Sequence, residues 1–452
     1  MSLRELLNTP NIQTATEQGE ALVADAHRVD ADAIRLKSEI HLELLKKFDL
    51  SVMEKISEAE LRQRLAVFVD ETINEKNIIL GETQRKALIT SIQNEVMGLG
   101  PLEPLLADSA VSDILVNGPH TVYVERHGKL ELTNVRFTDD EHLLRIIEKI
   151  VSRIGRRVDE SSPMVDARLP DGSRVNAIIP PLALDGPALS IRRFSAVPLG
   201  VEQLVDYGSM TRDMAMMIAA MVKTKTNIII SGGTGSGKTT MLNLMSGFIP
   251  DDERIVTIED AAELRLQQPH VVRLETRPPN IEGEGEINQR ALIKNSLRMR
   301  PDRIIVGEVR GAEVLDMLQA MNTGHEGSMA TIHANTARDA LTRLENMVAI
   351  SGLNMPVRPL RQQIVSALTA IIQVSRLSDG KRKIISILEL TGMEGDMIST
   401  QEIFRFQQTG VAPDGTVQGR FRATGIRPKF AEKVAARGAP LPEYLFDPDH
   451  NG

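Results

Sequence analysis

Residues 232–240, GGTGSGKTT, carry the spacing Gly-x-x-x-x-Gly-Lys-Thr, in which each residue type suits the binding of phosphate groups. Backbone N–H groups of a glycine loop form a nest for anions where a helix begins, and glycine lets the chain approach phosphate oxygens closely. Lys238 is expected to hold the β- and γ-phosphates of a nucleotide, and Thr239 to place its hydroxyl on Mg²⁺. The predicted nucleotide-binding residues are Gly232, Gly233, Thr234, Gly235, Ser236, Gly237, Lys238, Thr239 and Thr240.

Carboxylates follow two downstream apolar runs, where they could serve hydrolysis of the nucleotide. RIVTIEDAAEL contains Glu259, Asp260 and Glu263, and RIIVGEVRG contains Glu308 after a glycine where a second carboxylate is typical. Bound Mg²⁺ keeps several waters, so a carboxylate can steady it through one of them. We expect Glu259 or Asp260 in that role, and Glu308 or Glu263 as the group that orients the attacking water. A helix cap or a salt bridge is the structural alternative for each.

The elements that must position these residues alternate between helical patterns and apolar runs. From about residue 200 the runs are TNIIISGG, RIVTIED, VVRLE, RIIVGE, SMATIHA and AIIQVSRL. Such alternation is typical of a parallel sheet with helices on both faces. Ligands of these α/β sheets bind beyond the carboxyl ends of the strands, where the glycine loop and the carboxylates would meet.

The chain as a whole is too long for one core and divides into segments of different pattern. Residues 1–30 are polar without periodicity, which predicts a flexible tail. Residues 31–97 have helical periodicity and predict an all-α domain, with an interaction surface as the alternative. Residues 98–195 predict a mixed α/β domain. A linker is expected at 196–204, before an α/β domain over 205–452 with C-terminal hairpins and an extension.

The amino-acid composition excludes or disfavours several classes of function. A formal charge of −8, three Tyr and no Trp disfavour a protein that forms stable complexes with nucleic acid. The lack of cysteine excludes disulfides and thiolate chemistry. The longest apolar run, 214–222, is about half of the ~20 residues that cross a membrane, so we expect a cytoplasmic protein without a transmembrane segment.

A methionine stripe at helical spacing predicts core packing against the sheet, with a subunit boundary as the alternative; its members are Met210, Met214, Met217 and Met221.

Four motifs resemble, in order, those of a known superfamily. SGGTGSGKTT, TIEDAAEL, RPDRIIVGEVRGAE and TGHEGSMATIHANT are similar to the Walker A, Asp box, Walker B and His box of the secretion ATPases, which drive type II secretion, type IV pili and type IV secretion. SDILVNGP, VYVERHGKLE, DARLPDGSRVNAIIPP, LSIRRF and LRMRPDRIIVGEVRGAE resemble the tight-adherence, TadA/CpaF-type branch. The resemblance covers roughly 95–400 and implies a RecA-like P-loop ATPase domain.

The resemblance also assigns roles to single residues. In this superfamily the Walker B strand ends in Gly-Glu, so Gly307 is consistent with an active site. The catalytic carboxylates are then Glu308 and the acidic residues of the Asp box. His325 and His333 match the two His-box positions, where a neutral imidazole can donate a hydrogen bond to phosphate or water and report the nucleotide state.

Arginines complete the predicted site. Related ATPases use arginines of both domains and of the neighbouring subunit against the polyphosphate, and the guanidinium fork pairs well with phosphate oxygens. Solvated surface arginine is the alternative. The candidates are Arg168, Arg174, Arg192 and Arg193 in the first α/β domain, and Arg277, Arg298, Arg300 and Arg310 in the second.

Three functions compete at this point. The first is an ATP- and Mg²⁺-dependent hydrolase that forms a homo-hexamer, lies peripherally at the inner membrane and drives platform proteins of a pilus or secretion machine. The second is a nucleic-acid translocase, and the third is a nucleotide-dependent switch without motor action. Glu308 discriminates among them, because a motor needs its carboxylate for turnover and not for nucleotide binding.

Overall fold

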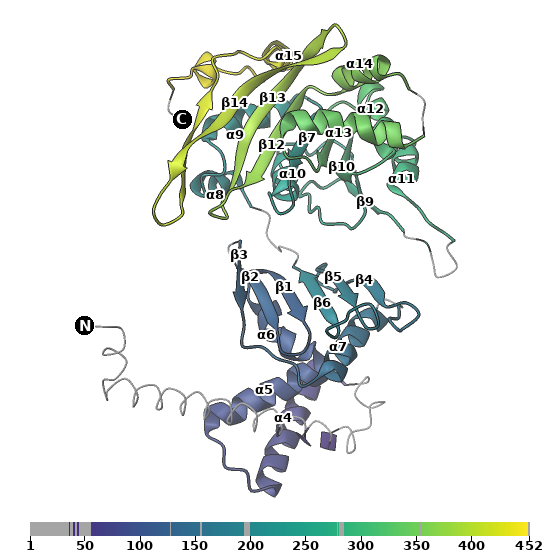
Figure 1. Cartoon of the computed structure of the whole chain (residues 1–452), viewed down its shortest axis with the longest axis vertical. Coiled ribbons are helices and arrows are strands. Elements are labelled where there is room, and N and C mark those ends of the chain that lie inside the picture. The colour runs from purple at the N-terminus through teal and green to yellow at the C-terminus, as the bar shows by residue number, and fades with distance from the viewer. Residues whose placement is uncertain are drawn as a thin grey trace, which may run out of the picture. The chain divides into compact units, whose positions relative to one another are not determined.

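The computed structural model describes residues 56–450 apart from 127, 154–155, 194–198, 278, 280–283 and 353–354, together with 36, 39–40 and 43–44. The predicted tail over 1–30 lies outside the described residues. The chain divides into two compact units, Met1–Phe194 and Ser195–Gly452, and each is described by itself (Figure 1).

Helices α4, Glu58–Glu75, and α5, Glu82–Met97, contact each other in the first unit. Ser57 caps α4, since its hydroxyl accepts a hydrogen bond from the Glu60 N–H at 3.3 Å. The apolar stripes of the two helices meet in one buried cluster that also includes two residues from the preceding segment. Its buried members are Ile40, Leu44, Leu65, Phe68, Val69, Ile73 and Ile92. Among the described residues of this segment, the apolar stripes therefore form a packed core.

The rest of the first unit is an antiparallel sheet covered on one face by α7, Asp140–Ser152. Within the described residues the strand order is β3-β2-β1-β6-β5-β4. The strands are β1 Val111–Asn117, β2 Val122–Arg126, β3 Lys129–Leu132, β4 Met164–Arg168, β5 Arg174–Ile178 and β6 Ala188–Arg192. Every second residue of β5 and β6 is buried, so the opposite face of the sheet carries polar side chains. This confirms the mixed α/β character predicted for the segment.

The second unit is built on a long mixed sheet. Within the described residues its order is β15-β14-β13-β12-β7-β11-β10-β8-β9. The strands are β7 Ile228–Gly232, β8 Ile255–Glu259, β9 Val271–Glu275, β10 Arg303–Val309, β11 Met329–Ile332, β12 Ala370–Arg376, β13 Arg382–Glu394, β14 Met397–Val411 and β15 Val417–Ala423. The strands from β12 to β9 are parallel, and β13, β14 and β15 add antiparallel hairpins. The predicted α/β fold and the hairpins after residue 376 are confirmed.

Helices cover both faces of this sheet. One buried cluster joins α9 and α10 to one face, and a second cluster joins α12, α13 and α14 to the other. The helices of the unit are α8 Val201–Asp206, α9 Arg212–Lys223, α10 Lys238–Ser246, α11 Gln289–Ser296, α12 Glu313–Asn322, α13 Ala337–Ile350, α14 Val357–Ala367 and α15 Phe430–Ala436. Residues 201–204, expected in the linker, form the start of α8, and Leu204 is buried in the core.

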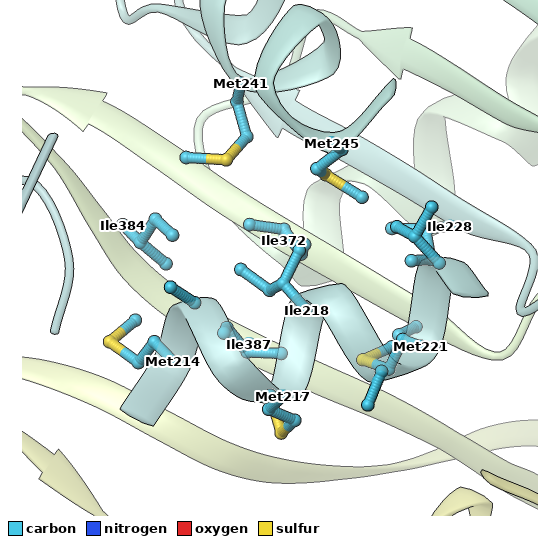
Figure 2. Packing of buried hydrophobic residues seen from close by; sticks show 14 of the residues in the cluster. Met214, Met217, Ile218, Met221, Ile228, Met241, Met245, Ile372, Ile384 and Ile387 are labelled. Carbon is cyan, nitrogen blue, oxygen red and sulfur yellow. The ribbon is translucent and has the colours of Figure 1, made fainter. Parts of the chain in front are cut away.

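The methionine stripe lies in the core, as predicted. Met214, Met217 and Met221 of α9 are fully buried and lie beside isoleucines of the sheet (Figure 2). Met210 is also buried. None of the helices in the described part of the chain is both long and apolar enough to span a membrane.

Candidate active site

The glycine loop connects β7 to α10 at the carboxyl edge of the second sheet. Gly235 and Gly237 have φ angles of 67° and 96°, a conformation that side chains other than glycine rarely adopt. Gly232 is also sterically required, because a Cβ atom there would lie 2.5 Å from the Val374 carbonyl oxygen. The Lys238 ammonium donates to the carbonyl oxygens of Gly232 and Gly233 at 3.0 and 2.9 Å. The loop therefore has the shape of an anion nest, with its lysine folded over it.

Glu259 ends β8 beside the neighbouring strand β10 and is 3% exposed. Its Oε2 accepts hydrogen bonds from the backbone N–H groups of Glu263 and Leu264 at 2.7 and 3.0 Å. Its Oε1 is buried with no hydrogen-bond partner among the described residues. Burial raises the pKa of Glu259 to about 7, although the two N–H donors act in the opposite direction. One carboxylate oxygen thus orders the Asp-box turn, and the other remains available for a ligand.

The glycine at position 307 makes room for this side chain. A Cβ atom built on Gly307 would lie 2.8 Å from Cγ of Glu259. Glycine at position 307 of β10 therefore leaves the space that the Glu259 side chain of the adjacent strand β8 occupies. A carboxylate of the neighbouring strand, that of Glu259, therefore lies beside the position where RIIVGEVRG has a glycine.

We expect Gly307→Ala to displace Glu259 and to lower the free energy of unfolding by about 1–3 kcal/mol, the usual cost of overpacking. ATP turnover should fall as well, because the Asp-box turn depends on the Glu259 carboxylate. Denaturant unfolding and turnover assays measure the two effects. Gly410→Ala is the control, because Gly410 lies on β14 outside the site and a Cβ atom there would meet only Oε1 of Gln418, at 3.7 Å. A Gly307→Ala protein with wild-type stability and turnover would contradict this packing.

The pKa of Glu259 also predicts a pH dependence of stability. Its folded-state pKa of about 7 lies above its unfolded value of ~4.3, so the folded state binds this proton more tightly. Protonation of Glu259 therefore stabilises the folded state fully below pH ~4, and this stabilisation is lost as the pH rises through the folded-state pKa of about 7. Between pH ~5 and ~8 the loss in the free energy of unfolding is roughly 2–3 kcal/mol. Denaturant unfolding of the nucleotide-free proteins measures this effect: between pH ~5 and ~8 the free energy of unfolding of the wild type should fall by that amount more than that of Glu259→Gln. Parallel curves would contradict it.

Glu308, Asp260 and Arg310 form an ionic cluster at the same edge. Oε2 of Glu308 accepts from Nε and Nη2 of Arg310 at 3.0 and 2.6 Å. Nη1 of Arg310 lies 3.5 Å from Oδ2 of Asp260. Arg310, which the resemblance makes a candidate for contact with phosphate, pairs with these two carboxylates in the structure.

The two His-box histidines lie at opposite ends of β11. His333 follows the strand at the carboxyl edge, where burial and then the charge of Lys238 lower its pKa, so the imidazole is neutral at pH 7. His325 precedes the strand, and the Ser328 hydroxyl donates to its carbonyl oxygen. Because β11 and β7 are parallel, His325 lies at the amino edge, away from the glycine loop. Within one chain the fold brings only His333 of this pair to the site.

The predicted arginines of the second unit are dispersed. Arg277 follows β9 at the carboxyl edge and donates its Nε to the Gly285 carbonyl oxygen at 2.7 Å. Arg298 and Arg300 are exposed between α11 and β10, at the amino edge. Neither lies beside the glycine loop of its own chain, so a role for them in the site requires another subunit.

Three predicted arginines of the first unit form a row on its sheet. Arg168 of β4 lies directly opposite Arg174 of β5, which in turn lies opposite Arg192 of β6. All three belong to the face away from the core. The row therefore presents three guanidinium groups side by side on one face of the sheet. Arg193 points the other way and donates to the carbonyl oxygens of Asp108 and Val111, so it acts as a structural brace.

Two arginines beside the glycine loop were missing from the sequence prediction. Arg382 donates its Nε to the Gly235 carbonyl oxygen at 2.8 Å, and an Arg376 guanidinium nitrogen lies 3.6 Å from the Cβ position of Gly235. They flank the turn between β12 and β13, more than a hundred residues after the loop. No motif marks them, because their proximity arises from the pairing of β12 with β7.

Most of the chain is similar in sequence to known proteins. A family model described as "Type II/IV secretion system protein" matches residues 95–426. A putative conjugal transfer protein of Mycobacterium tuberculosis is 39% identical over 323 residues, 70% of this chain and 91% of that protein. The conjugal transfer protein TrbB of Rhizobium radiobacter is 32% identical over 308 residues, 67% of this chain and 91% of that protein. The solved structure of the VirB11 ATPase from the Brucella suis type IV secretion system is 27% identical and covers 64% of this chain and 95% of its own, at a TM-score of 0.35.

Proposed function

Because the chain belongs to the type II/IV secretion system protein family, we propose that it is a motor ATPase of the tight-adherence branch. In this proposal it hydrolyses ATP as a homo-hexamer at the cytoplasmic face of the inner membrane. Its domain movements drive platform proteins that assemble or retract a pilus or secrete a substrate. The observation that carries the proposal is the meeting of the glycine loop, Glu259, Glu308 and His333 at one edge of the sheet.

The geometry supports hydrolysis by a water molecule positioned on the γ-phosphate. Lys238 and the N–H groups of the loop hold the β- and γ-phosphates. Glu308 orients the water and accepts its proton, and the water oxygen bonds to the γ-phosphorus as the bond to the β,γ-bridging oxygen breaks. Neutral His333 donates a hydrogen bond to phosphate or to the water. Arg310 donates to Oε2 of Glu308, so the other carboxylate oxygen, Oε1, is the one that would accept from the water.

The residues present also fit Mg²⁺. Thr239 stands in the first turn of α10, and the unpartnered Oε1 of Glu259 is an oxygen acceptor in the same edge of the sheet. Hard oxygen ligands of this kind suit Mg²⁺, with Thr239 as a direct ligand and Glu259 or Asp260 acting through water. When bound, the ion supplies positive charge that neutralises the phosphates.

The row of arginines on the first unit is the feature that favours a ring of several subunits. Arg168, Arg174 and Arg192 belong to the first unit and the glycine loop to the second. Arginines on a separate unit can reach the polyphosphate from the same chain or from a neighbour, as fingers that stabilise the charge of the transition state. A site completed by a neighbour is formed only in the oligomer.

The experiment measures ATP turnover per subunit against protein concentration, then mixes two inactive variants. Turnover of the wild type should rise sigmoidally with concentration. Arg192→Ala and Glu308→Gln should each be inactive, and an equal mixture should regain about a quarter of wild-type turnover if the arginine acts in trans, because about one interface in four is complete. Arg422→Ala, on the C-terminal hairpin, is the matched control.

The results also separate the competing functions. Concentration-independent turnover together with no regain in the mixture would contradict a site that is completed between subunits. Tight nucleotide binding without turnover at any concentration would favour the nonmotor switch. Turnover stimulated by single-stranded DNA or RNA would favour the nucleic-acid translocase.

A further inference from the structure

The turn between β12 and β13 carries two arginines next to the glycine loop. Arg376 ends β12 and Arg382 begins β13, and they are direct partners in the register of the two strands. The turn is closed by a hydrogen bond from the Leu377 N–H to the Lys381 carbonyl oxygen at 2.8 Å. Its strands belong to the core of the sheet, so the arginines stand on a rigid support.

A carboxylate anchors the turn to the C-terminal hairpin. Oδ1 of Asp379 accepts from the Lys381 N–H, and Oδ2 accepts from the Val417 N–H at the start of β15, both at 3.0 Å. These donors hold the pKa of Asp379 below its usual value even though burial acts in the opposite direction. The turn is therefore fixed from both sides, and its position over the loop does not depend on a flexible tip.

Both arginines lie beside the part of the loop that has positive φ angles. Arg382 donates its Nε to the Gly235 carbonyl oxygen at 2.8 Å. Its Cδ lies 3.4 Å from the Cβ position of Gly237, and Arg376 lies 3.6 Å from that of Gly235. Both glycines have positive φ, so this is the segment that turns its N–H groups toward an anion.

Strand order shows which end of a nucleotide the arginines would meet. The sequence β12-β7-β11-β10-β8 places the glycine loop between the β12–β13 turn and the strands that carry Glu308 and Glu259. The γ-phosphate must face those carboxylates for hydrolysis. The α-phosphate and the nucleoside then extend from the loop on the side of β12, a step that rests on the proposed function.

We propose that Arg376 and Arg382 form the α-phosphate side of the nucleotide site. Arg382 is a positioning residue that holds the glycine loop through Gly235, and the two guanidinium groups place positive charge beside the α-phosphate of ATP or ADP. Neither arginine is among the candidates expected from the family motifs. It makes the turn between β12 and β13 part of the nucleotide site.

The test measures ADP binding and ATP turnover in full-length variants. Arg382→Gln and Arg376→Gln should each raise the Kd for ADP and the KM for ATP about tenfold or more, as expected for a lost hydrogen bond to a charged group, and leave kcat within about twofold. Arg382→Lys should restore part of the affinity, since it keeps the charge without the fork. Arg405→Gln, an exposed arginine of β14, should match the wild type.

Two results would overturn the proposal. One is ADP affinity that stays at the wild-type level in both Gln variants. The other is a joint loss of kcat and thermal stability with unchanged ADP affinity, which would show a structural role alone. ADP binding separates this proposal from the proposed function. A wild type that binds ADP and lacks turnover would contradict the motor function, and the prediction for ADP affinity of the arginine variants would still apply. A wild type that fails to bind ADP removes both.

Discussion

Glu308→Gln is expected to lower ATP turnover by about a hundredfold or more and to leave nucleotide affinity within about threefold, because a carboxylate that positions the attacking water contributes roughly 10²–10⁴ in rate. The amide keeps the size of the side chain and can still accept from Arg310, so the ionic cluster loses charge and keeps its shape. Nucleotide binding depends on the glycine loop and Lys238, which belong to other elements.

Single-turnover assays and nucleotide titrations measure the two quantities separately. Glu432→Gln is the control, since Glu432 lies in the first turn of α15 outside the site. An equal loss of affinity and turnover would contradict the role of Glu308, because it would place the carboxylate in ground-state binding. Retained turnover would transfer the role to Glu263, the other candidate from the sequence pattern.

Glu253→Gln is expected to lower the free energy of unfolding by about 3–5 kcal/mol, because it leaves a buried guanidinium without its counter-ion. Arg303 is 0% exposed at the amino end of β10, and its Nε and Nη2 donate to the two Glu253 oxygens at 2.6 and 2.9 Å. Nη1 of Arg303 donates to the Val222 carbonyl oxygen at 2.7 Å, which ties α9 to the sheet. Lys225 lies 3.5 Å from Glu253.

A double variant tests the reason for this loss. Removing both charges, as in Glu253→Gln with Arg303→Met, should recover much of the stability, because no unpaired charge stays buried. Asp252→Asn, at an exposed neighbouring position, should cost less than about 0.5 kcal/mol. Urea unfolding of the four proteins gives the comparison. A loss below about 1 kcal/mol for Glu253→Gln would show that the pair contributes little.

Local patterns in the sequence were sufficient for the elements and for the phosphate loop. Apolar runs between helical segments predicted the parallel strands, and the glycine spacing predicted the loop, because both depend on residues close together in the chain. The methionine stripe was assigned to the core by its helical spacing, and the structure buries it. Glu259 and Glu308 were placed at one edge since parallel strands end together.

Pairing between distant segments decided the rest of the site. The reason for a glycine at position 307 becomes visible only in the sheet, where β10 lies beside β8 and the absence of a Cβ atom on Gly307 leaves space for Glu259. The direction of β11 sends His333 to the glycine loop and His325 to the opposite edge, although one short motif contains both. Arg193 braces its own unit, and Arg382 reaches Gly235 from a hairpin far along the chain. Sequence determines what each residue can do chemically, and the register and order of strands determine which residues meet, because contacts across a sheet join positions that no local spacing relates.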